Sequence, residues 1–276
     1  MKNSLRVLQW QKVVSPDVEQ NLKIAEAGCR RAKELGADLL ALPEMFCCPY
    51  EAKNFPHYAE PERGRIWSCC ATLAAKYGLL LSAGSMPERG ADGSIYNSAY
   101  VFGPDGQEIA KHRKMHLFDI DVPGGQRFFE SETLRAGDTV TVFPTEYGPM
   151  GLCVCYDARF PELGRLMALQ DARLLLVPAS FNHTTGPLHW ELTLRAQAMF
   201  NQFFVVGTAT ALDSSASYAS WGHSLTADPW GRVLAQLGSD EGEQLVEIDL
   251  CESDEVRQQI PLLRHLRTDV YELREK

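Results

Sequence analysis

Short apolar runs alternate along this chain with longer segments whose apolar residues recur at helical spacing. Leu5–Trp10 and Asp38–Leu42 are apolar runs that predict buried strands. Between them, we expect a helix with Pro16 in its first turn and its end at Gly36. The apolar face of that helix comprises Val18, Leu22, Ala25, Cys29 and Ala32. Strand, helix and strand in this order are typical of α/β proteins.

The same order continues through the first half of the chain. Ile66–Tyr77 predicts a helix that ends at Gly78, and Leu79–Ala83 predicts the next strand. Tyr96–Phe102 and Glu108–Lys111 then flank the turn sequence Gly-Pro-Asp-Gly, which predicts a hairpin.

The second half repeats the first in order. The pairs of similar segments are Ala37–Pro43 and Ala172–Pro178, Leu80–Gly84 and Phe204–Gly207, and Gly103–Ala110 and Asp228–Ala235. We therefore expect two pseudo-equivalent halves, each a sheet with helices on one face. Packing the open faces together gives a four-layer α-β-β-α sandwich. We expect a single domain over residues 1–276, with ligands at the carboxyl ends of the strands.

Composition excludes several classes of function. The 276 residues are 45% hydrophobic, which suffices for a full core, and the net charge of −9 disfavours a nucleic-acid partner. The apolar runs are too short to cross a membrane, and the N-terminus lacks a secretory apolar region. The eight cysteines include adjacent pairs and one Cys-x-Cys, which suit neither disulfides nor zinc. We expect reduced thiols, no metal and a cytoplasmic location.

Cys155 is the candidate nucleophile. An apolar run stops at this residue and a helical pattern begins a few residues later, so the thiol lies on a sharp turn. Backbone N–H groups of the following helix can favour a thiolate and hold an oxyanion. A buried core cysteine is the alternative interpretation. Cys153, two residues upstream, faces the same side of an extended strand, but it lies inside the strand.

Two further segments supply a base and a cation. Glu44 follows a strand and a proline, where a carboxylate can take a thiol proton or simply cap a helix. Lys114 ends a basic run that borders the apolar pair Leu117 and Phe118, so it can stabilise a negative oxygen or lie on a solvated face. The local sequence around Glu130 by itself indicates a surface residue. A Cys-His pair stays open, with His112, His116, His183, His189 and His223 as candidate bases, although no histidine spacing marks one.

Together these segments resemble the nitrilase, or carbon–nitrogen hydrolase, superfamily. Glu44, Lys114 and Cys155 match its three signature residues, and Glu130 matches its second glutamate. Longer strings resemble the omega-amidase branch: His116–Gly124, Phe181–Asn182, Thr184–Pro187, His189–Glu191, Tyr218, Trp221–Ser224 and Arg257–Pro261. Cys48 and His183 depart from that pattern near the expected pocket mouth, which leaves the exact substrate open.

The resemblance implies a small-molecule amide substrate, no metal or organic cofactor, and a homodimer or higher assembly. The omega-amidase branch hydrolyses the terminal amide of 2-oxoglutaramate and 2-oxosuccinamate to ammonia and a 2-oxo dicarboxylate. By the same resemblance, a C-terminal extension from about residue 260 to 276 packs at a subunit interface.

The expected mechanism assigns a role to each candidate. Glu44 accepts the Cys155 proton, the thiolate forms a thioester, and Lys114 with the Tyr156 N–H holds the oxyanion. Glu130 orients Lys114 or the amide. The substrate carboxylate binds Arg159, and hydrogen bonds come from three further residues, Tyr50, Thr184 and Thr185.

Two alternatives remain. The first is a related amidase with the same machinery, either a deaminated glutathione amidase or an N-carbamoyl amidohydrolase. The second is a non-catalytic binding or scaffold protein on the same fold.

Overall fold

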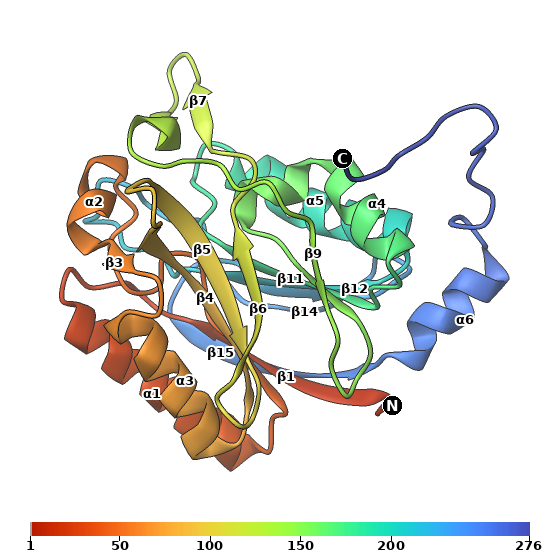
Figure 1. Ribbon diagram of the computed structural model, residues 1–276, viewed down its shortest axis with the longest axis horizontal. Helices are drawn as coiled ribbons and strands as arrows, with labels where there is room; N and C mark the ends of the chain where they lie inside the picture. Colours follow the sequence, from red (N-terminus) through yellow and green to blue (C-terminus); the bar gives the residue numbers. More distant parts are fainter. Residues whose placement is uncertain (1) are drawn as a thin grey trace.

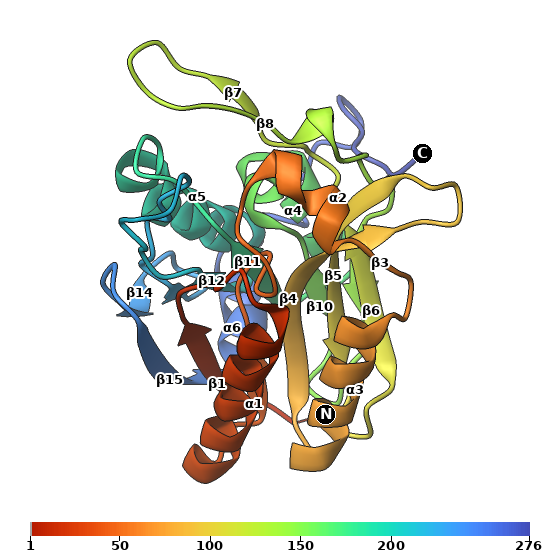
Figure 2. The ribbon, with the colours of Figure 1, turned by 90° about the vertical axis from the view of Figure 1, so that its left-hand side faces the viewer.

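Two β-sheets lie face to face at the centre of the molecule, shown by the computed structural model for residues 2–276 (Figures 1 and 2). The first sheet has seven strands in the order β15-β1-β2-β4-β5-β6, with β3 paired to β4. Its strands are β1 (Ser4–Gln11), β2 (Leu39–Ala41), β3 (Glu60–Pro61), β4 (Leu80–Arg89), β5 (Ile95–Phe102), β6 (Glu108–Arg113) and β15 (Gly242–Asp249).

The second sheet has six strands in the order β14-β13-β12-β11-β10-β9. Its strands are β9 (Thr141–Phe143), β10 (Met150–Leu152), β11 (Leu174–Ala179), β12 (Phe204–Ala209), β13 (Leu225–Ala227) and β14 (Val233–Gln236). In each sheet three neighbouring strands are parallel, β1, β2 and β4 in one and β10, β11 and β12 in the other. The expected repeat of two similar halves is confirmed.

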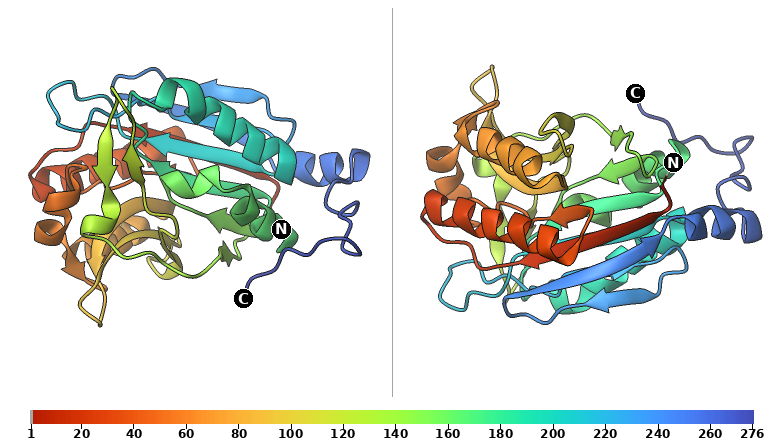
Figure 3. Two further views of the ribbon diagram at one scale, coloured as in Figure 1. Left: turned by 90° about the horizontal axis from the view of Figure 1, so that it is seen from above. Right: turned by 90° about the horizontal axis from the view of Figure 1, so that it is seen from below.

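Helices cover the outer face of each sheet (Figure 3). On the first sheet these are α1 (Val18–Leu35) and α3 (Arg65–Tyr77), and on the second they are α4 (Pro161–Leu169) and α5 (Gly186–Asn201). The four-layer α-β-β-α order is therefore confirmed. The remaining helices are α2 (Phe55–Tyr58), α6 (Cys251–Gln259) and the short 3-10 turns η1 (Ala52–Asn54), η2 (Glu130–Glu132) and η3 (Cys155–Arg159).

The ends of α1 follow from local chemistry. Asp17 is its N-cap and accepts a hydrogen bond from the Glu19 N–H, so the expected place of Pro16 inside the first turn is wrong: Pro16 lies two residues before Val18, the first residue of the helix. A capping carboxylate serves the free N–H groups of the first turn better than proline, and it fixes where the helix begins. Gly36 ends the helix with φ 66°, in the left-handed region that glycine adopts at little cost.

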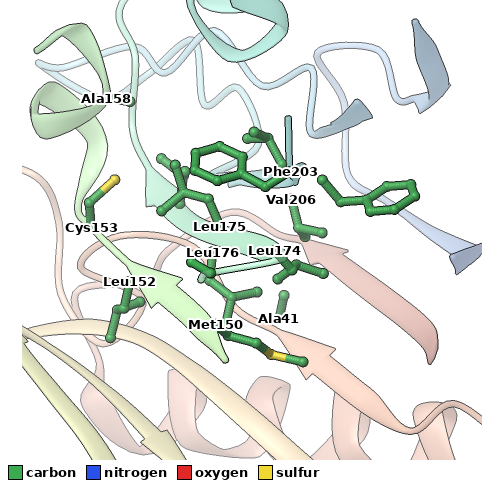
Figure 4. Packing of buried hydrophobic residues seen from close by; sticks show 14 of the residues in the cluster. Ala41, Met150, Leu152, Cys153, Ala158, Leu174, Leu175, Leu176, Phe203 and Val206 are labelled. Atoms are coloured by element: carbon green, nitrogen blue, oxygen red, sulfur yellow. The ribbon is translucent and has the colours of Figure 1, made fainter. Parts of the chain in front are cut away.

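Strand alternation divides the core into two parts. On β1, Val7 belongs to the cluster that extends between the sheets and under α4 and α5, whereas Leu8 belongs to the cluster under α1 and α3. Figure 4 shows the same alternation near the end of β10, with Leu152 directed toward the other sheet and Cys153 toward Ala158. Each of these apolar side chains contributes about 1.5–3 kcal/mol when it is fully buried. The two clusters fix the strands whose ends carry the polar residues described below.

Two buried glutamines of β1 join the sheets. Gln9 Nε2 donates to the Gly207 carbonyl at 2.7 Å, and its Oε1 accepts from Thr226 Oγ1 at 2.9 Å. Gln11 Oε1 accepts from the Ser224 N–H at 2.9 Å. Since unpaired amides are costly in a core, these bonds favour one alignment of the two sheets over others.

A two-stranded hairpin stands out from one end of the sandwich. It consists of β7 (Asp119–Asp121) and β8 (Arg127–Phe129), and it projects beyond the sheets in Figures 1 and 2. After α6 the chain returns along the body to end beside α4 (Figure 1). Within residues 2–276 we find no helix that is both long and apolar enough to span a membrane, and no cluster of three potential metal ligands.

Candidate active site

Cys155 lies on a sharp turn directly after β10. The strand ends at Leu152, and Cys155 begins η3 with φ 49°, which is left-handed and uncommon for a residue with a side chain. The expectation that Cys153 lies inside the strand is wrong, because β10 ends at Leu152. Both thiols are buried in the same apolar cluster, Cys153 with 1% and Cys155 with 4% of its surface exposed. Strain of this kind is typical of functional positions.

Asp157 holds this turn in place. Its Oδ2 accepts from the Val154 N–H at 3.0 Å and contacts His112 Nε2 at 3.1 Å. Its Oδ1 accepts from the His116 N–H and contacts His116 Nδ1, both at 2.8 Å. Burial opposes the charge of Asp157, but the hydrogen bonds from both histidines and Val154 outweigh it and hold its pKa well below the usual range. Asp157 therefore connects the Cys155 turn to the segment around Lys114.

Glu44 follows β2 and is 1% exposed. Its Oε1 accepts from Asn97 Nδ2 at 2.8 Å and from Lys114 Nζ at 2.9 Å, and it lies 3.2 Å from the Tyr50 hydroxyl oxygen. Its Oε2 is buried and has no hydrogen-bond partner among residues 2–276. One carboxylate oxygen is thus anchored, and the other is left to accept a proton.

Lys114 lies between two carboxylates. Its Nζ is 2.9 Å from Glu44 Oε1 and 2.9 Å from Glu130 Oε1. Glu130 is fully buried, and its Oε2 accepts from the Phe118 N–H at 2.7 Å. The interpretation of Glu130 as a surface residue, made from its local sequence alone, is therefore wrong, because a cation and an N–H group compensate its charge inside the protein.

The buried charges shift one another's pKa. Burial opposes the charge on Lys114, yet Glu130 and Glu44 outweigh it and raise the pKa of its ammonium. Burial raises the pKa of Glu44, with Lys114 opposing that change. Burial and the charge of Glu44 raise the pKa of Cys155, while Lys114 and the Ser180 N–H lower it. The resting group at Cys155 is consequently a neutral thiol, beside Glu44 and the fixed ammonium of Lys114.

Tyr50 connects the Lys114–Glu130 pair to a group of aromatic side chains. Its hydroxyl donates to Glu130 Oε1 at 2.5 Å. Its ring packs on Phe128 of β8 at 5.4 Å and on Tyr218 at 4.6 Å between centroids. Burial raises the pKa of Tyr50 well above its usual value, so it stays a neutral donor. The hairpin thus closes one side of the site through Phe128.

Arg159 lies on the other side, at the end of η3. Its Nη2 donates to Thr185 Oγ1 at 3.0 Å, and its Nη1 lies 2.5 Å from His189 Nδ1. Its guanidinium carbon is 4.5 Å from the centre of the Phe181 ring and 5.7 Å from that of Tyr156. Burial lowers the pKa of Arg159. No Asp or Glu within the described chain forms an ion pair with Arg159, so this cation is free to bind an anion.

The other expected binding residues lie around Arg159 and the hairpin. The half-buried Tyr156 packs against Phe118 with centroids 5.1 Å apart. Thr185 touches Arg159, whereas the Thr184 methyl group lies against Gly125 at the tip of the hairpin. The structure brings Glu44, Lys114 and Glu130 into direct contact, with Cys155 beside them, and it leaves Thr184 at the rim.

Several residues of the site were not expected from the sequence. Asp157, Asn97 and Ser180 carry short polar side chains that no local pattern marks, and Asn182 stood in a quoted string without a role of its own. The nearest indication was the pair of histidines that flank Lys114, which we considered as bases. The candidate histidines each have a contact other than Cys155: Asp157 for His112 and His116, the Trp221 ring for His183, Arg159 for His189, and the Trp221 carbonyl for His223.

A small cavity reaches the site from the surface. Its volume is about 40 Å³, and it is lined by Glu44, Tyr50, Ser180, Thr210, Tyr218 and Ser220, among others. It has room for water or a small leaving group such as ammonia. A base, a fixed cation and a thiol in one buried centre suit acyl transfer from an amide.

Comparisons with known proteins agree with this chemistry. The family model described as carbon-nitrogen hydrolase matches residues 4–258. The chain is 47% identical over 266 residues to "Omega-amidase NIT2" of Xenopus tropicalis, covering 96% of each chain. It is 45% identical over 268 residues to "Omega-amidase NIT2" of Homo sapiens, covering 97% of each.

A solved structure shares the fold. The crystal structure of Saccharomyces cerevisiae Nit3, described as a member of branch 10 of the nitrilase superfamily, superposes with a TM-score of 0.89 at 35% identity. That match covers 97% of this chain and 98% of the yeast chain. This chain belongs to the carbon–nitrogen hydrolase family, within the nitrilase superfamily, and is a hydrolase of carbon–nitrogen bonds other than peptide bonds.

Proposed function

We propose that this protein is an omega-amidase that hydrolyses the terminal amide of 2-oxoglutaramate or 2-oxosuccinamate through a cysteine thioester. The observation that carries the proposal is a buried Glu44–Lys114–Glu130 cluster beside Cys155, with an unpaired cation, Arg159, at the end of the same turn. The curated relatives named omega-amidase, at 45–47% identity over nearly the whole chain, support the choice of branch.

In the first half of the reaction, Glu44 Oε2 takes the Cys155 proton and the sulfur attacks the amide carbon. As the C–S bond forms, the electron pair of the C=O π bond moves to the carbonyl oxygen, and Lys114 and the Tyr156 N–H stabilise the resulting oxyanion. When the intermediate collapses, the C–N bond breaks and Glu44 returns the proton to the leaving nitrogen. Ammonia and a Cys155 thioester result, and the charges of Glu44 and Lys114 are restored.

In the second half, water attacks the thioester carbon and Glu44 accepts its proton. The C–S bond then breaks, the acid leaves, and the proton returns to sulfur. Glu130 keeps Lys114 in position throughout, since it binds Nζ at 2.9 Å and is itself fixed by the Phe118 N–H. A positioned acid–base group contributes roughly 10²–10⁴-fold in rate, and an oxyanion donor about 10²–10³-fold.

Arg159 is the proposed partner of the substrate carboxylate. A half-buried cation without a carboxylate partner is costly, and a bound carboxylate offsets that cost through a charge-assisted hydrogen bond. Thr185 holds the guanidinium by accepting from Nη2, while Tyr50, Tyr156 and Thr184 are proposed to line the path of the substrate.

Ammonia release tests this function. The substrates are 2-oxoglutaramate and 2-oxosuccinamate, compared with glutamine, asparagine and deaminated glutathione, and Cys155→Ala is the blank. We expect turnover of the first two and none in the variant, and a thioester mass on Cys155 after rapid acid quenching. Activity only on deaminated glutathione or on an N-carbamoyl compound would reject the omega-amidase assignment and retain the mechanism.

We further propose one domain over residues 1–276 and a homodimer or higher assembly with residues 260–276 at the interface. Tyr271 and Val270 are exposed apolar residues of this segment, which supports a partner there. Light scattering of the full chain and of a chain ending at Ile260 tests this, with a smaller particle expected after truncation. We also propose a cytoplasmic location, supported by eight free cysteines.

A further inference from the structure

Two buried hydrogen-bond donors beside the candidate site have no partner among residues 2–276. They are Arg159 Nε and Asn182 Nδ2. Asn182, which follows β11, is 1% exposed. A buried polar group without a partner is destabilising, so a ligand that supplies the partner is favoured there.

The free end of the Asn182 amide is identified by its other contacts. Its Oδ1 accepts from the Thr185 N–H at 2.9 Å and from Thr185 Oγ1 at 3.0 Å. Because N–H can only donate, the acceptor must be the oxygen, and Nδ2 is the unpaired atom. Thr185 Oγ1 also accepts from Arg159 Nη2 at 3.0 Å. One hydroxyl group therefore connects the two side chains that carry free donors.

Both donors lie near the reacting thiol. Asn182 lies two residues after Ser180, and Ser180 lines the same cavity as Glu44. Asn182 also pairs with Ser220 in an isolated bridge, and both Ser180 and Ser220 line the cavity that reaches Glu44. Arg159 is close enough for its charge to interact with Cys155. A ligand bound at Cys155 would thus lie near Asn182 Nδ2 and Arg159 Nε.

A pair of donors selects for ligand groups that only accept. A 2-oxo acid offers carboxylate oxygens and a ketone oxygen on adjacent carbons, all acceptors. A 2-amino acid of the same length carries an ammonium at the second position, which only donates. That ammonium would leave Asn182 Nδ2 unpaired and would add a positive charge close to Arg159.

We propose that Asn182 is a specificity-determining residue: its Nδ2 donates to the 2-oxo oxygen of the substrate while Arg159 binds the adjacent carboxylate. This rests on the proposed function, since it concerns how the same site distinguishes 2-oxo amides from amides without that oxygen. It goes further by assigning the recognition of the ketone to one atom.

The test compares 2-oxoglutaramate with glutaramate, which has the same length and carboxylate but no 2-oxo group. The wild-type protein should favour 2-oxoglutaramate in kcat/KM. Asn182→Asp keeps an oxygen for Thr185 and replaces the donor by an acceptor, so the preference should fall about tenfold or more. Asn182→Ser, which is neutral, should lower the same ratio. Asn3→Asp, the same change at an exposed position, should leave it as in the wild type.

The ratio of kcat/KM for 2-oxoglutaramate to kcat/KM for glutaramate separates a loss of ketone recognition from general damage to the protein. A variant that loses kcat/KM equally for both amides has a structural role at this position, and that result overturns the proposal. A wild-type protein that turns over both amides without favouring the 2-oxo compound also overturns it, even if no variant folds. If the wild type releases ammonia from neither, the proposed function itself fails.

Discussion

Asp157 Oδ2 lies 3.1 Å from His112 Nε2, and both side chains are completely buried. Asp157 comes two residues after Cys155, and His112 comes two residues before Lys114. The other oxygen of Asp157 binds His116, two residues after Lys114. One carboxylate therefore sets the position of the nucleophile's turn relative to the segment that carries the cation.

Removal of the Asp157 carboxylate should lower both the free energy of unfolding and the rate of catalysis. Asp157→Ala leaves His112 and the Val154 and His116 N–H groups without a buried acceptor, so we expect a loss of about 3–5 kcal/mol in unfolding free energy. Asp157→Asn should lose less, because its oxygen still accepts. Urea unfolding measures both, with Asp171→Asn on an exposed turn as the control. Equal stability of Asp157→Ala and wild type would contradict this role.

The lowered pKa of Asp157 also predicts that the free energy of unfolding depends on pH. Its folded pKa is lowered, so the stability it contributes is present above the unfolded value of about 3.9 and is lost as pH falls through that value toward the folded pKa. The unfolding free energy of the wild type should therefore fall more steeply than that of Asp157→Asn from about pH 5 to pH 3. Urea titrations at the two pH values check this, and parallel slopes would count against it.

Glu44→Gln should preserve the fold and remove the base. An amide oxygen can still accept from Lys114 and Asn97, but the group can no longer take a proton from Cys155. We expect kcat to fall by roughly 10²–10⁴-fold. Ammonia release measures this, and Glu162→Gln on the exposed start of α4 is the matched control. A variant with more than a tenth of wild-type kcat would exclude Glu44 as the base.

Arg159→Met should weaken binding of amides that carry a carboxylate. The lost charge-assisted hydrogen bond is worth about 1.5–3 kcal/mol, which corresponds to a KM increase of roughly ten- to a hundredfold. Propionamide, which has no carboxylate, provides the internal comparison and should show a much smaller change. Arg30→Met, on the exposed face of α1, controls for the loss of a charge. Equal increases in KM for both amides would argue against a carboxylate site.

Tyr50→Phe isolates the contribution of one hydroxyl. The ring can keep its contacts with Phe128 and Tyr218, so unfolding should change by no more than about 1 kcal/mol. The hydrogen bond to Glu130 is lost, and we expect kcat to fall about three- to tenfold because the Glu130–Lys114 pair is held less firmly. Steady-state kinetics measure this against Tyr77→Phe. An unchanged kcat would assign Tyr50 to packing alone.

Much of the fold was predictable because its determinants are local. The apolar run of β1, the αL glycine after α1 and the turn between β5 and β6 depend on neighbouring residues only. The order of similar segments in the two halves then limits how two one-sided sheets can bury their apolar faces.

The candidate site was predictable where a residue follows a strand end. Glu44 and Cys155 come directly after the apolar runs of β2 and β10, and Lys114 directly follows β6, so local patterns were enough to select them. Glu130 was selected only by resemblance, because nothing near it in the sequence indicates that Lys114 and the Phe118 N–H would bury and balance its charge.

By itself the sequence determined which strands end in a thiol, a carboxylate and an ammonium, since apolar periodicity and turn residues act over a few positions. Only the tertiary structure decided which polar atoms are satisfied within the protein. Asp157 meets His112 across 45 positions of the chain, whereas Asn182 Nδ2 and Arg159 Nε meet no partner in the described part of the chain, residues 2–276. Burial and pairing depend on groups that arrive from distant strands, and it is the atoms left unpaired after packing that a substrate can use.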